Sequence, residues 1–141
     1  MNAERARLLR LRRLEKIRDI AKQTAARDAA EAEGTLAQLR ALCERTGRLA
    51  GEYAARRDAE QGNALRQQLR FVDGLEAIRR NTLDEVRRAE AIADAKLRLL
   101  ATAERRRAAV DDRAQAQERL IARGRETPAL HGRKPSGTGL E

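Results

Sequence analysis

The sequence predicts an all-α protein: a two-helix antiparallel coiled-coil hairpin followed by a disordered C-terminal tail. Three observations lead to this fold class. Charged residues make up 38% of the 141 residues, and the only aromatic side chains are Tyr53 and Phe71, which leaves too little bulky apolar surface for a thick globular core. The apolar residues recur at helical spacing. One glycine-containing break, Gln61-Gly62-Asn63, lies near the middle of the chain.

The first helix is predicted over residues 3–60, a segment without proline. Uncharged residues follow one another there by threes and fours, which is the spacing of a coiled-coil seam. This predicted first seam consists of Leu14, Ile17, Ala21, Ala25, Ala29, Ala32, Leu36, Leu39, Cys43, Thr46, Ala50 and Tyr53. Its early members take consecutive steps of four, which predicts a local unwinding of the supercoil.

The second helix is predicted over residues 64–124, and its seam contains one charged residue, Arg107. The seam consists of Phe71, Leu75, Ile78, Thr82, Val86, Ala89, Ala93, Leu97, Leu100, Ala103, Arg107, Val110, Ala114, Gln117 and Ile121. The turn is predicted at 61–63, because glycine suits the left-handed position after a helix and asparagine caps the next one. Residues whose numbers add up to about 125 then face each other, such as Leu36 and Ala89.

Residues 126–141 contain two prolines, three glycines and the single histidine, His131, without any period. They are predicted to form a disordered tail. The sequence has no glycine-rich phosphate loop, no Cys or His pair at ligand spacing and no serine nucleophile motif. We therefore expect no catalytic residue, no metal and no cofactor, and we interpret Cys43 as a packed, unreactive thiol on the first seam.

No apolar run approaches the roughly 20 residues that a membrane span requires. The basic residues 1–13 are not followed by the apolar core of a signal peptide. One cysteine excludes an internal disulfide framework, which fits a reducing compartment. These features predict a cytoplasmic protein.

The net charge of +9, from 31 Lys or Arg and 22 Asp or Glu, has two open interpretations: solvation of a thin helix pair, or a surface for an acidic partner. Basic residues concentrate where the two ends of the predicted hairpin meet. The candidate contact residues there are Arg5, Arg10, Arg12, Arg13, Lys16, Arg105, Arg106, Arg113 and Arg119. The neighbouring Leu8, Leu9 and Leu11 favour a protein socket over a phosphate-binding surface.

A second candidate surface lies near the predicted turn. Its residues recur at i, i+4, i+7 and i+11 on each helix, and they are Leu42, Thr46, Leu49 and Tyr53 on the first helix and Phe71, Leu75, Ile78 and Thr82 on the second. Core packing explains part of this pattern, but Leu42 and Leu49 stand just off the seam. The excess apolar surface would dock another helix or linker.

The stretches LRRLEKIRDIAKQTA and LRFVDGLEAIRRNTLDEVRRAE resemble the flagellar FliJ family of type III export proteins, and the resemblance covers residues 8–125. It implies a small, basic, non-enzymatic helical hairpin whose base enters the central hole of the hexameric FliI-like export ATPase. On this resemblance the basic residues bind the ATPase and promote its assembly and activity. The protein would then lie at the cytoplasmic face of the inner membrane through its partners alone, as a monomer.

The resemblance also implies that the apolar stripe binds the linker of the FlhA export gate, and that the protein handles export chaperones. The stripe residues match the family's 4-3-4 spacing on both helices. Thr46, Leu49 and Thr82 depart from the residue types that the family places there.

Two other functions stay open on the residues alone. The charge of +9 would suit a nucleic-acid-binding coiled coil with strongly salt-dependent affinity, although the sequence lacks aromatic stacking platforms and groove-reading motifs. A structural or scaffolding coiled coil would instead self-associate through the same seams, and sedimentation would reveal it.

Overall fold

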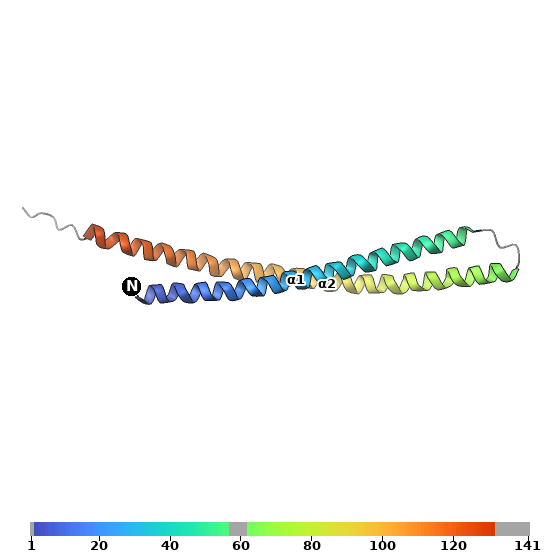
Figure 1. Ribbon diagram of the computed structural model, residues 1–141, viewed down its shortest axis with the longest axis horizontal. Coiled ribbons are helices and arrows are strands. Elements are labelled where there is room, and N and C mark those ends of the chain that lie inside the picture. Colours follow the sequence, from blue (N-terminus) through green and yellow to red (C-terminus); the bar gives the residue numbers. More distant parts are fainter. Residues whose placement is uncertain (1, 57–61, 132–141) are drawn as a thin grey trace, which may run out of the picture. The chain divides into compact units, whose positions relative to one another are not determined.

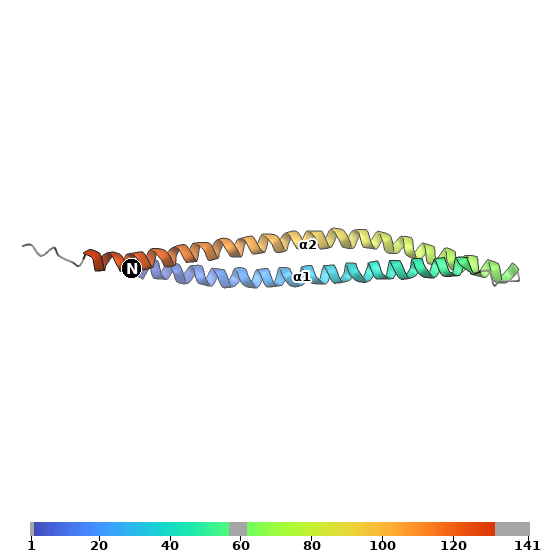
Figure 2. The same cartoon turned by 90° about the horizontal axis from the view of Figure 1, so that it is seen from above.

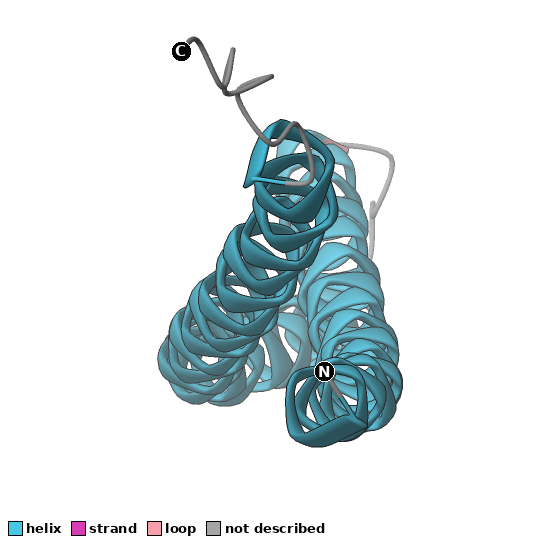
Figure 3. Ribbon diagram, turned by 90° about the vertical axis from the view of Figure 1, so that its left-hand side faces the viewer, coloured by secondary structure: helices cyan, strands magenta, loops and turns pink. Residues whose placement is uncertain are grey.

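The computed structural model describes residues 2–56 and 62–131, with side chains up to residue 125. It contains two helices, α1 (Asn2–Ala55) and α2 (Gly62–His131) (Figure 1). Every described residue except Arg56 lies in one of them (Figure 3). The predicted all-α helical hairpin is therefore confirmed.

The chain divides into two compact units. Unit 1 combines Met1–Thr24 with Ala101–Glu141, and unit 2 is Ala25–Leu100. Within each unit a segment of α1 lies beside a segment of α2 that runs in the opposite direction: blue beside orange and red in unit 1, and cyan beside yellow-green in unit 2 (Figure 2).

Helix α1 ends at Ala55, five residues before the predicted end at residue 60. The last carbonyl groups of a helix lack intrahelical hydrogen-bond partners. Here a side chain of α2 donates hydrogen bonds to two carbonyl groups at the end of α1. The Gln68 amide donates to the carbonyl oxygens of Tyr53 and Arg56, the latter at 2.7 Å. The Arg56 N–H also donates to the Tyr53 carbonyl at 3.3 Å, which tightens the final turn. These bonds stabilise the helix end at a point that no glycine or proline marks.

Helix α2 begins at Gly62. The sequence predicts this glycine as the left-handed residue that follows the first helix. No glycine of the described residues has a positive φ, so Gly62 does not adopt the left-handed conformation expected of it. It is instead the first residue of α2, because α1 has already ended at Ala55. The predicted turn residue Gln61 lies outside the described residues.

Helix α2 ends at His131, seven residues beyond the predicted end at 124. The prediction relied on Gly124 and Pro128 as helix breakers. A single proline removes one backbone donor and bends a helix at some cost, but the helical backbone continues through it here. The helical backbone thus extends to His131, six residues into the segment predicted as a tail, and 132–141 lie outside the described residues.

The apolar core of unit 2 follows the predicted register. Leu36, Val86, Ala89 and Ala93 form one buried cluster, against which Ala32 and Leu39 pack. The predicted facing pairs Leu36–Ala89, Leu39–Val86 and Ala32–Ala93 all fall within this group. Nearer the turn, the rings of Tyr53 and Phe71 meet edge to face with centroids 4.7 Å apart.

Unit 1 has a different seam from the predicted one. Ile17 and Ala21 are exposed, whereas the polar residues Glu15, Arg18 and Lys22 are partly buried beside α2. On α2 the buried residues of this unit are Val110, Ala114, Gln117 and Ile121. Asp19 approaches Arg107, a pair whose numbers add up to 126, so the predicted register holds in unit 1. Of the predicted α1 residues in this unit, Leu14 is partly buried, whereas Ile17 and Ala21 are exposed.

The observed seam of α1 keeps a strict three-four alternation. Its heptad positions a and d are occupied by Leu8, Leu11, Glu15, Arg18, Lys22, Ala25, Ala29, Ala32, Leu36, Leu39, Cys43, Thr46, Ala50 and Tyr53, all of which are buried or partly buried. The predicted consecutive steps of four do not occur. A helix that keeps its heptad phase cannot turn Ile17 toward its neighbour, and the methylene stems of Arg18 and Lys22 pack there instead.

The seam of α2 shows the same regularity. Its positions a and d are Gln68, Val72, Leu75, Arg79, Thr82, Val86, Ala89, Ala93, Lys96, Leu100, Ala103, Arg107, Val110, Ala114, Gln117, Ile121 and Gly124. The predicted seam members Phe71, Ile78 and Leu97 are exposed. Each is one residue away from a seam position, because the prediction selected the larger apolar neighbour of Val72, Arg79 or Lys96.

The heptad phase in unit 1 predicts opposite outcomes for two aspartate substitutions. Leu11→Asp places a charge opposite Ala114, which is fully buried, and should lower the free energy of unfolding by at least about 2 kcal/mol. Ile17→Asp adds a charge on an exposed face and should change that free energy by less than about 0.5 kcal/mol. Urea unfolding followed by far-ultraviolet circular dichroism measures both free energies. A larger loss of stability in Ile17→Asp than in Leu11→Asp would support the predicted seam through Ile17.

Candidate functional site

Nearly all of the net charge belongs to unit 1. Residues 1–24 contain eight Lys or Arg against three Asp or Glu, and residues 101–125 contain seven against four, which gives +8. Residues 25–100 contain fourteen against thirteen, which gives +1. An acidic partner is therefore attracted to unit 1 far more strongly than to unit 2.

The predicted basic contact residues all lie in unit 1, but not on one face. Eight of the nine are exposed, namely Arg5, Arg10, Arg13, Lys16, Arg105, Arg106, Arg113 and Arg119. On α1, Arg10, Arg13 and Lys16 occupy the outward heptad positions c, f and b. On α2, Arg106 and Arg113 occupy position g beside the seam. The cations thus lie on more than one side of the unit.

Arg12 is the exception among the predicted contact residues, because it is engaged inside the hairpin. Its Nη1 lies 2.6 Å from Glu15 Oε2 and 3.1 Å from Asp111 Oδ1, and its Nη2 lies 2.5 Å from Glu118 Oε1. Hydrogen bonds to Glu118 and Glu15 raise the pKa of Arg12 above its ordinary value. Arg12 therefore joins α1 to α2 and is partly exposed, with its guanidinium already paired to three carboxylates.

A layer of two arginines, Arg18 and Arg107, lies in the seam of unit 1. Both Nε atoms are buried and neither makes a hydrogen bond. Arg107 Nε nevertheless lies 2.9 Å from Asp19 Oδ1 in an ion pair. A groove of about 380 Å³ beside this layer is lined by Arg12, Glu15, Lys16, Asp19, Ile20 and Arg107. The mixed charges of this lining favour ion pairing within the unit over capture of an anion.

The predicted apolar stripe of unit 2 separates into a buried and an exposed half. Thr46 and Thr82 are buried, and each hydroxyl donates to the backbone carbonyl four residues earlier, at 2.8 Å. They occupy seam positions and offer nothing to a partner, which corrects their assignment to a contact surface. Tyr53 and Leu75 are partly buried for the same reason.

The exposed half lies at a single heptad position, where Glu85 is the one charged residue between Ile78 and Ile92 on α2. Leu42, Leu49, Phe71 and Ile78 are exposed, and all four occupy heptad position g. In an antiparallel pair, the g positions of both helices border the same side of the seam. We call these four residues, with Ile92 and Leu99, the apolar row. Ile92 and Leu99 were missed by the sequence prediction, although both are exposed g residues that a strict heptad assignment identifies.

The opposite side of the seam carries ion pairs at heptad position e, where α2 also has the exposed residues Leu69, Leu83 and Leu97. In unit 2, Arg40 Nη2 lies 2.9 Å from Glu90 Oε1. In unit 1, Arg12 reaches both Asp111 and Glu118. Among the cross-helix ion pairs of the described residues, those of Arg12 and Arg40 thus lie at position e, whereas the exposed apolar residues Leu42, Leu49, Phe71 and Ile78 lie at position g.

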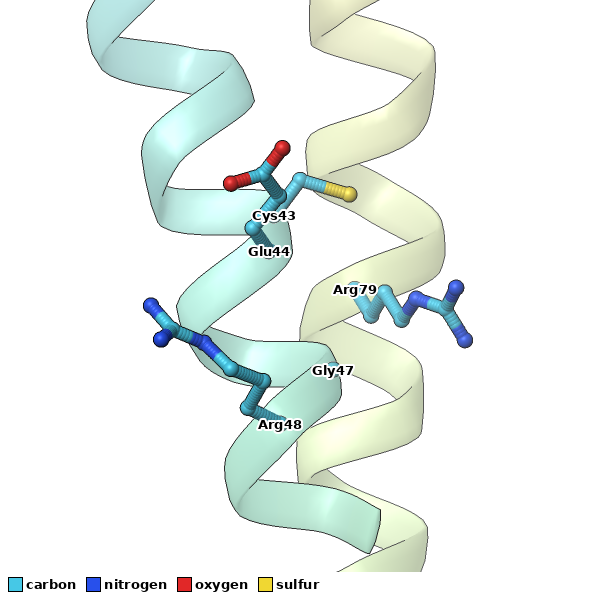
Figure 4. A pocket seen from close by; sticks show the side chains of 5 residues that line it. All are labelled: Cys43, Glu44, Gly47, Arg48 and Arg79. Atoms are coloured by element: carbon cyan, nitrogen blue, oxygen red, sulfur yellow. The ribbon is translucent and has the colours of Figure 1, made fainter.

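A shallow groove of about 510 Å³ in unit 2 is lined by Cys43, Glu44, Gly47, Arg48 and Arg79 (Figure 4). Arg79 crosses from α2 over Gly47, where a Cβ would lie only 3.2 Å from Arg79 Nε. The missing side chain of Gly47 thus makes room for an arginine at a seam position. Cys43 is partly buried, as expected of a packed thiol.

The described residues contain no group of three or more His, Cys, Asp or Glu side chains that could hold a metal ion. Within the same residues, neither helix has a stretch long and apolar enough to cross a membrane. The side chain of His131 lies outside the residues whose side chains are described. Comparison with known proteins found no family model, no curated protein and no solved structure that matches the chain.

The Arg12 ion-pair network generates a prediction about stability. Arg12→Ala leaves the carboxylates of Glu15, Asp111 and Glu118 close together without their shared cation, so the midpoint of thermal unfolding should fall. Arg13→Ala, which removes an exposed neighbour, is the matched control and should leave the midpoint nearly unchanged. The difference should shrink in about 1 M NaCl, where the Debye length is roughly 3 Å. Equal midpoints for both variants at low salt would contradict the network.

Proposed function

We propose that this chain is a non-enzymatic stalk and adaptor of the flagellar type III export apparatus, with unit 1 docking on the hexameric export ATPase. The observation that carries the proposal is the concentration of +8 of the net charge in unit 1, with eight exposed basic side chains around it. A surrounding acidic socket would meet cations on every side. The FliJ-like sequence stretches supply the identity of the socket.

Unit 2 supports the second half of the proposal, binding to the FlhA export gate and to export chaperones. Its net charge is close to neutral, and its apolar row exposes side chains at heptad position g. Such a row fits an amphipathic helix or linker that inserts apolar side chains at i, i+3 or i+4, and i+7. Leu42, Leu49, Phe71 and Ile78 remain the contact residues, without Thr46 and Thr82.

The proposed docking of unit 1 on the export ATPase is tested by charge reversal on α2. Arg106→Glu with Arg113→Glu should abolish stimulation of the purified export ATPase, because two exposed cations would then repel an acidic socket. Arg66→Glu with Arg70→Glu, a matched reversal in unit 2, should leave stimulation intact. ATP hydrolysis is measured with the full chain added to the ATPase. Stimulation by the Arg106 and Arg113 variant at the level of the unaltered chain would exclude this docking mode.

The proposed binding of unit 2 to the FlhA export gate is tested by comparing substitutions on the two sides of this unit. Ile78→Asp in the apolar row should weaken binding to the linker-containing cytoplasmic part of FlhA by at least about tenfold, since apolar anchors dominate such contacts. Leu83→Asp, on the opposite side of the same helix, is the matched control and should bind nearly as well as the unaltered chain. Isothermal titration calorimetry measures both affinities. Equal weakening by both variants would argue against a side-specific contact.

A further inference from the structure

The outward face of α1 in unit 1 differs from every other outward helix face of this protein. Heptad positions b, c and f of residues 2–24 are occupied by Asn2, Ala3, Ala6, Leu9, Arg10, Arg13, Lys16, Ile17, Ile20, Gln23 and Thr24. They include three large aliphatic residues and three cations, and no acidic residue. All three acidic residues of this segment lie elsewhere: Glu4 and Glu15 occupy the seam positions d and a, and Asp19 occupies the flanking position e.

The aliphatic residues of this face are among the most exposed of the protein. Leu9 is 59% exposed, Ile17 61% and Ile20 63%. At the outward positions of α1 in unit 2 there is no large aliphatic residue, and three glutamates, Glu31, Glu44 and Glu52, are present. The outward positions of α2 contain no large aliphatic residue in either unit through residue 125. The pattern is therefore specific to one segment.

We propose that this face of α1, with Leu9, Ile17 and Ile20 among Arg10, Arg13 and Lys16, docks on the surface of an anionic lipid bilayer. Interfacial helices bury aliphatic side chains at the level of the headgroups while basic residues contact lipid phosphates. The stems of Arg13 and Lys16 lie between Leu9 and Ile20 along the helix, and long basic side chains reach outward past such neighbours. The absence of carboxylates removes repulsion from the lipid.

Outside the ATPase socket of the proposed function, this face fits a bilayer better than it fits a nucleic acid or the surface of another protein. Nucleic-acid phosphates would pair with the three cations but would leave Leu9, Ile17 and Ile20 in water. Protein interfaces place apolar residues at the centre and deplete it of charge. Here Arg10 directly follows Leu9 and Lys16 directly precedes Ile17, so charge and apolar surface are mixed throughout. A headgroup layer above acyl chains accepts both at once.

This proposal does not rest on the proposed export function, and vesicles alone test it. The full chain should sediment with vesicles of phosphatidylcholine containing a minority of phosphatidylglycerol and stay in solution with phosphatidylcholine alone. Each basic residue near an anionic surface contributes about a fivefold factor to partitioning. The substitutions Arg10→Gln, Arg13→Gln and Lys16→Gln together should therefore reduce binding roughly a hundredfold. The matched control replaces Arg66, Arg70 and Arg80 of unit 2 by Gln and should change binding far less.

The aliphatic contribution separates docking from a diffuse electrostatic attraction. Ile17→Ser with Ile20→Ser should lower partitioning at least about tenfold, whereas Ile92→Ser with Leu99→Ser, equally exposed in unit 2, should bind as the unaltered chain does. The chain contains no tryptophan, so Ile20→Trp introduces a single reporter whose emission should shift to the blue on anionic vesicles. No binding to these vesicles, or full binding by the Ile17 and Ile20 variant, would overturn the proposal. Preferential binding of a nucleic acid or an acidic protein with no vesicle binding would also overturn it.

Discussion

The constraint on which the structure depends is the uninterrupted heptad phase of two antiparallel helices. Residues whose numbers add up to about 125 face each other in both units, as Asp19 and Arg107 do in unit 1 and Tyr53 and Phe71 do in unit 2. Once that phase is set, each residue is assigned to the seam or to solvent by its position and not by its own hydrophobicity. The burial of Arg18 beside Arg107, and the exposure of Ile17, follow from this assignment.

The same phase makes the two sides of the helix pair chemically different. The e positions carry the cross-helix ion pairs of Arg12 and Arg40, which favour the antiparallel register because other registers would separate these charges. In unit 2 several g positions carry exposed apolar residues, which stabilise little within a two-helix structure because one side of each remains in water. Alanine layers such as Ala32 and Ala93 also bury little area. A helix pair with so small a core gains stability when a partner covers its exposed row.

The sequence predicted the fold class, the register and most of the seam in unit 2, because there the larger apolar residues occupy heptad positions a and d. It failed where a larger apolar residue stands one position from a polar seam residue, as Ile17 does beside Arg18 and Ile78 beside Arg79. It also missed the end of α1, since the bonds from Gln68 to two carbonyl groups join residues twelve or more positions apart. The pairing of Arg12 with Asp111 and Glu118 of α2 was missed for the same reason.

Unit 1 shows the most direct departure from the pattern that stability alone would favour. Its seam on α1 contains Glu15, Arg18 and Lys22, while Leu9, Ile17 and Ile20 face outward. Exchanging these two sets would give a more apolar seam and a more polar surface, so hairpin stability cannot be the reason for the present order. Sequences depart from consistent patterning mainly where a function requires it. The outward set of eleven positions also contains no carboxylate, although 22 of the 141 residues are acidic. Both departures favour a surface adapted to an anionic, partly apolar partner over a solvated helix that happens to be basic.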